Sequence, residues 1–177
     1  MIVVTSNHLK TKEIAMVRKY ARFVLDRMVR RSIQNKSRIN IRILDEEEIK
    51  DAADILDLKE YKAWCTYDGV DEVGKKKFSV VLARKRLNKR GKKPLTRLKN
   101  ILIDLGHELV HVKQYLNNEI FDYKNGDVRH KGIIFDASWG QDEESYYDSP
   151  WEVEAYGREW GLYKLFCRKL KEERLRK

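Results

Sequence analysis

The chain has 177 residues and carries 38 Lys and Arg against 28 Asp and Glu, a net charge of +10. This length predicts one domain over residues 1–177, and a content of 42% hydrophobic residues excludes disorder of the whole chain. No apolar stretch is long enough to cross a bilayer, and the first residues lack the basic segment of a secretory signal. Two cysteines, Cys65 and Cys167, favour reduced thiols over a disulfide framework. We therefore expect a soluble cytoplasmic protein with no membrane partner.

The first half of the chain contains one predicted helix and three predicted strands. Apolar residues recur at helical spacing over residues 12–31, which predicts an N-terminal amphipathic helix. Residues 38–44 alternate between polar and apolar, which is typical of a half-buried strand. Two further strands are expected at 63–67 and 78–84. The acidic stretch 45–62 is ambiguous, with a short helix as the nearest interpretation.

The second half contains two strong helix signals separated by a polar, irregular stretch. The first helix is predicted over 96–116 and the second over 150–171, and a hairpin is expected around 128–135. Helices and strands are therefore segregated along the chain. This order favours the α+β class, with a small and mostly antiparallel sheet.

One motif carries recognisable chemistry, the sequence His107-Glu108-Leu109-Val110-His111 within the predicted helix 96–116. Two histidines four residues apart lie about 40° apart around a helix, so both imidazoles can bind one metal ion. Glu108 lies about 100° from His107, beside the site, where a general base for a metal-activated water is needed. The pattern predicts a Zn²⁺ site on His107 and His111.

A zinc site of this kind needs a third protein ligand, and the sequence offers three candidates. Ser149 and Glu152 have the spacing of a capping box, which gives Glu152 a structural role at the start of the last helix. Glu154 has no such role, so we favour Glu154 as the ligand and keep Glu152 as the alternative. His130, in a glycine-containing loop, is the third candidate, whereas His8 has no motif around it and is expected at the surface.

Two blocks of sequence, residues 107–115 and 150–157, resemble the small zinc peptidases encoded by tailed bacteriophages. More broadly they are similar to minimal gluzincins, whose pattern is His-Glu-x-x-His followed by a distant Glu. The resemblance implies a zincin-like fold and a zinc metallopeptidase acting on protein or peptide substrates, in the host cytoplasm if the protein is viral. It also implies that zinc is bound by His107, His111 and Glu154 and that Glu108 is catalytic.

The chain departs from related patterns at several positions. Gluzincins often have an Asp four residues after the third ligand, where this chain has Arg158, so the partner of the first histidine must come from elsewhere. Gln114 and Asn117 replace the Gly and His of the metzincin extension. The loop around His130 has a weaker similarity to SprT-like DNA-associated proteases.

The reaction also needs a donor for the oxyanion that forms on the substrate carbonyl. Tyr146, Tyr147 and His130 precede the last helix and are the candidates. The sequence alone does not choose among them.

A basic segment over residues 75–93 contains ten Lys and Arg residues and no acidic residue. One interpretation is a phosphate-contacting patch, which would make the protein a nucleic-acid-binding module with a structural metal site. We favour a solvated surface instead, because Phe78 is the only aromatic residue in the segment.

Overall fold

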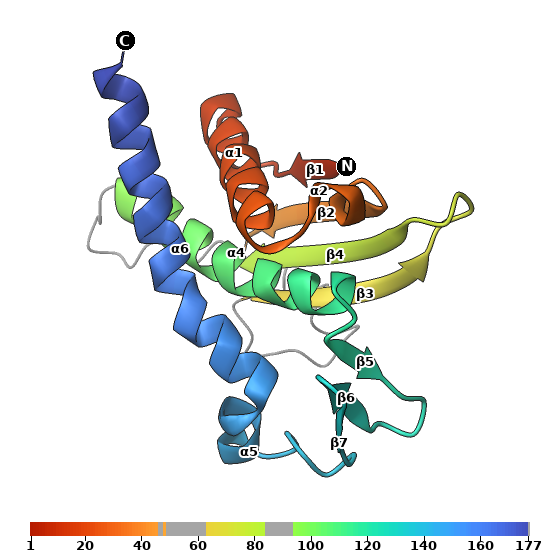
Figure 1. Ribbon diagram of the computed structural model, residues 1–177. Helices are drawn as coiled ribbons and strands as arrows, with labels where there is room; N and C mark the ends of the chain where they lie inside the picture. The colour runs from red at the N-terminus through yellow and green to blue at the C-terminus, as the bar shows by residue number, and fades with distance from the viewer. Residues whose placement is uncertain (46–47, 49–62, 84–93, 177) are drawn as a thin grey trace.

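The computed structural model describes residues 1–45, 48, 63–83 and 94–176 (Figure 1). The predicted stretch 45–62 and the basic residues 84–93 therefore lie almost entirely outside the described residues. The described helices are α1 (Thr11–Met28), α2 (Arg31–Gln34), α4 (Pro94–Leu116), α5 (Glu143–Asp148) and α6 (Pro150–Leu175). The strands form two sheets, and no described helix is long and apolar enough to cross a membrane.

The larger sheet has four strands in the order β1-β2-β4-β3. Its strands are β1 (Ile2–Thr5), β2 (Ser37–Leu44), β3 (Ala63–Val70) and β4 (Lys76–Ala83). β1 pairs with β2 and β2 with β4 in parallel, and only β3 and β4 are antiparallel. The α+β class is confirmed, but the expectation of a mostly antiparallel sheet is wrong for this sheet, which is mixed. The physical reason is that α1 forms the crossover between β1 and β2, and β4 lies between β2 and β3.

One face of this sheet is packed against α1 and α4 (Figure 1). Alternate residues of β2 and β4 point to that face because side chains alternate along a strand. They are fully or almost fully buried and comprise Ile39, Ile41, Ile43, Phe78, Val80 and Leu82. The facing helices contribute the buried stripe predicted from helical spacing, and burial of this apolar area is the main stabilising term of the fold.

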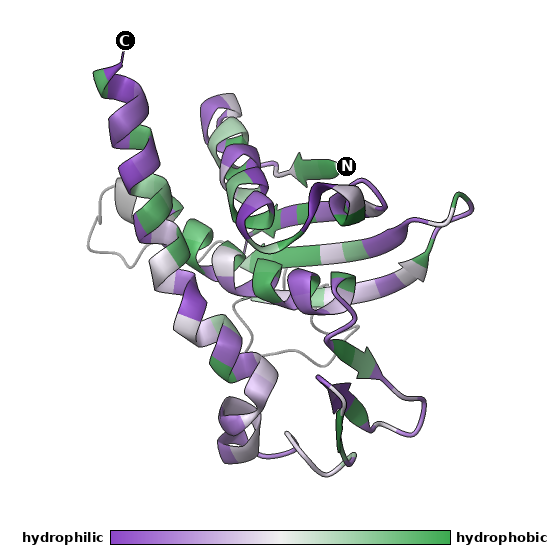
Figure 2. Cartoon of the chain, viewed as in Figure 1, coloured by the Kyte–Doolittle hydropathy of each residue, from purple (hydrophilic) through white to green (hydrophobic). Residues whose placement is uncertain are grey.

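The helix α6 crosses α4 and continues past it, so that its C-terminal half lies beside α1 (Figure 1). That half is mostly hydrophilic, whereas green residues dominate the middle of β4 (Figure 2). Near the other end of α6 lies the smaller antiparallel sheet of β5 (Ile120–Asp122), β6 (Val128–His130) and β7 (Ile133–Phe135). The predicted hairpin at 128–135 is confirmed as β6 and β7.

Candidate metal centre

The two histidines of the motif lie on α4, and Glu152 of the first turn of α6 lies opposite them. His107 Nε2 is 3.1 Å from a Glu152 carboxylate oxygen, and His111 Nε2 is 3.2 Å from the other oxygen. The two Nε2 atoms are themselves 3.2 Å apart. His107 and Glu152 are buried, so three residues that could each offer a ligand atom converge at one protected place.

The distances between the two Nε2 atoms and the carboxylate oxygens that they face are close to those between neighbouring ligands of a tetrahedral zinc site. Zinc binds nitrogen and carboxylate oxygen at about 2.0–2.2 Å, which places neighbouring ligand atoms of a tetrahedron roughly 3.3 Å apart. Two imidazole nitrogens that face each other without a proton or a cation between them repel. Two neutral imidazoles and one carboxylate form one of the donor sets found in catalytic zinc sites. The residues present therefore fit a zinc ion.

The opposite nitrogen of each imidazole faces an oxygen atom. His111 Nδ1 lies 3.0 Å from Gln114 Oε1, and Gln114, which is fully buried, donates in turn to the Trp151 carbonyl. His107 Nδ1 lies 3.3 Å from a Glu159 carboxylate oxygen, at ion-pair distance but not in a well-aligned hydrogen bond. These acceptors favour a proton on each Nδ1, which leaves Nε2 free to bind metal. Sequence reasoning missed both residues.

Glu108 is buried and lines a cavity together with His111 and Glu152. Burial raises the pKa of Glu108 to about 7, although the two histidines act in the opposite direction. A carboxylate with such a pKa can accept a proton at neutral pH and return it. The predicted position of Glu108 beside the histidines agrees with this geometry.

Glu154, the expected third ligand, lies elsewhere. Its carboxylate is 2.8 Å from Lys113 Nζ and 2.9 Å from Arg158 Nε, and it also accepts a hydrogen bond from Gln114. Although burial acts against it, Lys113, Gln114 and Lys131 lower the pKa of Glu154 to about 2. The structure thus places Glu152, and not Glu154, beside the histidines, because the two residues point about 200° apart around α6.

The predicted capping box is also wrong. The Ser149 hydroxyl donates to the Tyr146 carbonyl, and α6 begins without a side-chain cap at this residue. Glu152 therefore lacks the capping role that argued against it as a metal ligand. Its side chain contacts the histidines instead. Pro150 does stand at the start of α6, as expected.

The remaining predicted residues are spread around the site. His130 is buried and packs against Trp151, with ring centroids 6.0 Å apart, and it does not line the cavity that holds Glu108. Tyr146 lines that cavity, whereas Tyr147 is half exposed and packs on Tyr156. Of the three oxyanion candidates, the structure brings Tyr146 to the cavity wall.

His8 was expected at the surface, without a motif around it, and it is partly exposed. Its two partners were not identified from the sequence. Its Nε2 lies 3.2 Å from an Asp45 oxygen and 3.1 Å from a Glu48 oxygen. Asp45 and Glu48 also accept hydrogen bonds from each other's backbone N–H groups. These contacts satisfy the carboxylates as a capping arrangement, so the cluster needs no metal.

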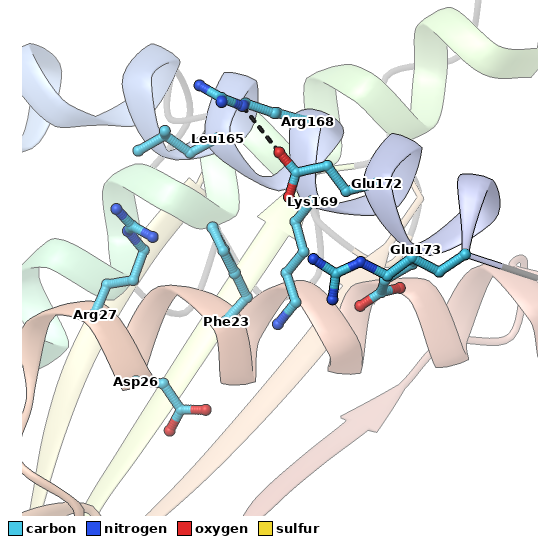
Figure 3. Close-up of a pocket in the computed structure, with 9 residues that line it drawn as sticks. Phe23, Asp26, Arg27, Leu165, Arg168, Lys169, Glu172 and Glu173 are labelled. Atoms are coloured by element: carbon cyan, nitrogen blue, oxygen red, sulfur yellow. Dashed lines mark hydrogen bonds and ion pairs between the residues drawn. The ribbon is translucent and has the colours of Figure 1, made fainter.

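A second cavity, of about 550 Å³, lies between α1 and the C-terminal half of α6 (Figure 3). Its floor is Phe23, which Lys169 approaches to 5.4 Å from the ring centroid, and its rim holds the Arg168–Glu172 ion pair. The described residues that line it include no histidine or cysteine. This groove is larger than the cavity at Glu108 but lacks the chemistry of that site.

Comparison with family models, curated proteins and solved structures finds no match for this chain. The assignment of a function therefore depends on the geometry of the site.

Proposed function

We propose that the protein is a zinc-dependent metallopeptidase of the zincin kind, with zinc held by His107, His111 and Glu152. The observation that carries the proposal is the convergence of His107 Nε2, His111 Nε2 and the Glu152 carboxylate at 3.1–3.2 Å. This replaces Glu154 of the expected ligand set while keeping the two histidines. When bound, zinc supplies a Lewis acid that lowers the pKa of water and polarises a carbonyl group.

Glu108 acts as the general base in this proposal. It removes a proton from water as the water oxygen bonds to the carbonyl carbon of the peptide. It then donates that proton to the departing amine as the C–N bond breaks. Glu108 is buried and lines the cavity beside the histidines, a position that suits a group passing a proton from water to the amine.

Tyr146 serves as the donor to the oxyanion. It lies on α5 and lines the same cavity as Glu108, and burial raises the pKa of its phenol, so the hydroxyl stays protonated. A protonated phenol can donate a hydrogen bond to the negative oxygen as it forms. The edge strand β3 forms the wall across the cavity, through Ala63, Trp64 and Cys65.

The experiment compares the purified protein with its Glu108→Gln and Tyr146→Phe variants on a quenched fluorescent peptide library. The wild type should cleave with zinc and lose activity after chelation. Glu108→Gln should keep its zinc but lose about 10²–10⁴-fold in kcat, because Gln cannot accept the proton. Tyr146→Phe should lose about 10²-fold or more in kcat. Wild-type protein that binds zinc and cleaves no peptide would refute the proposal.

Nucleic-acid binding is the second candidate function, and the groove between α1 and α6 is the observation in its favour. Arg27, Arg168, Lys169 and Arg176 line it, together with three carboxylates (Figure 3). In the 75–93 segment, Lys76 is already bound to the Tyr115 carbonyl and Asn118, and residues 84–93 lie outside the described residues. Salt-dependent binding of DNA or RNA, weakened by Lys169→Ala, would support this function.

A further inference from the structure

The cavity at the candidate metal centre extends well beyond Glu108 and the histidines. It has a volume of about 210 Å³ and continues to Tyr115 on α4 and to Ile120, Asp122 and Val128 of the small sheet. Tyr115 comes one helical turn after His111, which corresponds to about 6 Å along the helix axis. This distance is comparable with the length of an extended Lys or Arg side chain.

The charge of this cavity is opposite to that of the chain. Its wall carries three carboxylates, Glu108, Glu152 and Asp122, and none of the described lining residues is Lys or Arg, although the net charge of the chain is +10. The proposed zinc reaction uses Glu108 and Glu152. It gives no role to Asp122, which lies at the far end.

Asp122 is oriented by one hydrogen bond, and its second carboxylate oxygen can accept another. The Tyr115 hydroxyl donates to Asp122 Oδ2 at 2.6 Å, and this is the one hydrogen bond to the Asp122 carboxylate among the described residues. The side chain of Tyr115 is in turn stacked on Tyr67, with ring centroids 5.5 Å apart. The carboxylate is therefore oriented by a fixed phenol and keeps one open acceptor.

The rest of the wall suits the hydrocarbon part of a long side chain. Besides the carboxylates and His111, the lining residues are mainly apolar or aromatic and include Ala63, Trp64, Ile120, Val128 and Trp151. Lys and Arg pack their methylene stems on such surfaces while the charged end meets a polar partner. A guanidinium or ammonium group forms its strongest hydrogen bonds with a carboxylate.

We propose that Asp122 selects peptide substrates with Arg or Lys next to the scissile bond, the cationic side chain lying along α4 with its charge at Asp122. This inference rests on the proposed peptidase function and names its substrate class. Asp122 acts here through substrate binding and takes no part in proton transfer.

The test uses two sets of peptides that are identical except for Arg or citrulline next to the cleaved bond, because citrulline has the shape of arginine without its charge. Wild-type kcat/KM should favour the Arg peptide by roughly 2- to 5-fold, because Asp122 is exposed and water screens an ion pair at the surface. Asp122→Asn should bring the ratio of the two kcat/KM values close to one. The exposed Asp148 of α5, which does not line the cavity, provides a matched control, and Asp148→Asn should leave the ratio unchanged.

A binding measurement separates this inference from the peptidase proposal. Fluorescence anisotropy with the zinc-loaded Glu108→Gln variant should show tighter binding of the Arg peptide than of the citrulline peptide, and the added Asp122→Asn change should remove the difference. Zinc-dependent cleavage with equal rates for Arg and citrulline would overturn the role of Asp122 and leave the peptidase standing. Asp122-dependent binding of the Arg peptide without any cleavage by the wild type would overturn the peptidase and support a pocket for a cationic side chain at Asp122.

Discussion

Gly106 and the hydroxyl of Tyr20 are so close that a Cβ atom at residue 106 would lie 2.6 Å from Tyr20 Oη. Tyr20 is completely buried, so its hydroxyl cannot swing into solvent to make room. The same Cβ would lie 3.6 Å from the Glu159 carbonyl oxygen of α6. Gly106 directly precedes His107, and its missing side chain lets α1 and α6 approach α4 next to the candidate metal centre.

Gly106→Ala should therefore destabilise the protein, even though Ala is the better helix former by about 1 kcal/mol. Forcing a methyl group into this contact typically costs about 1–3 kcal/mol. Gly161→Ala on α6 is the matched control, since a Cβ there meets nothing within 4 Å and should stabilise the helix. Chemical denaturation measures the free energy of unfolding of both variants. A Gly106→Ala variant more stable than the wild type would show that the Tyr20 side chain moves aside at little cost.

Zinc content distinguishes the two glutamates at the start of α6. Glu152→Ala should lose zinc almost completely, as should His107→Ala, because each leaves only two protein ligands. Glu154→Ala should keep about one zinc per chain, since its carboxylate contacts Lys113 and Arg158. Elemental analysis after dialysis gives the result. Zinc lost from Glu154→Ala and kept by Glu152→Ala would return the ligand to Glu154.

The two residues that face the Nδ1 atoms of the histidines should affect zinc affinity without being ligands. Gln114→Ala and Glu159→Ala should each weaken zinc binding by about 10- to 100-fold, because they remove the acceptors that face Nδ1 of His111 and His107. Competition with a chromophoric chelator measures the affinity, and exposed Glu144→Ala on α5 serves as the control. Unchanged affinity in both variants would mean that the imidazoles are oriented by packing alone.

Acid should weaken the ion pairs of Glu154 in metal-free protein. The pKa of Glu154 is lowered to about 2 from an ordinary value of 4.5, chiefly by Lys113 and Gln114 acting against burial. Its stabilising effect is complete above pH 4.5 and is lost as the pH falls towards 2. The difference in unfolding free energy between wild type and Glu154→Gln should therefore be constant above pH 4.5 and shrink below it. A difference that persists at pH 2 would contradict the ionic origin.

The local elements followed from the sequence because their periodicity is strong. Helical spacing located α4 to within two residues at its start, and this placed His107 and His111 on one side of one helix. Alternation located β2, and the β6–β7 hairpin was expected within the polar stretch after α4. The short strands β1 and β5 were missed, since four and three residues are too few to show alternation.

Which of the two glutamates lies beside the histidines was decided by tertiary structure. Glu152 and Glu154 are two residues apart on α6, and local chemistry favoured Glu154 because Ser149 and Glu152 had the spacing of a capping box. The rotation of α6 against α4 determines which of the two faces the histidines, and that rotation depends on contacts between helices that are distant in sequence. The first turns of α6 are apolar on more than one side, so the sequence held no signal for the rotation. The packing of α6 against α4 turns Glu152 towards His107 and His111, whereas Glu154 contacts Lys113.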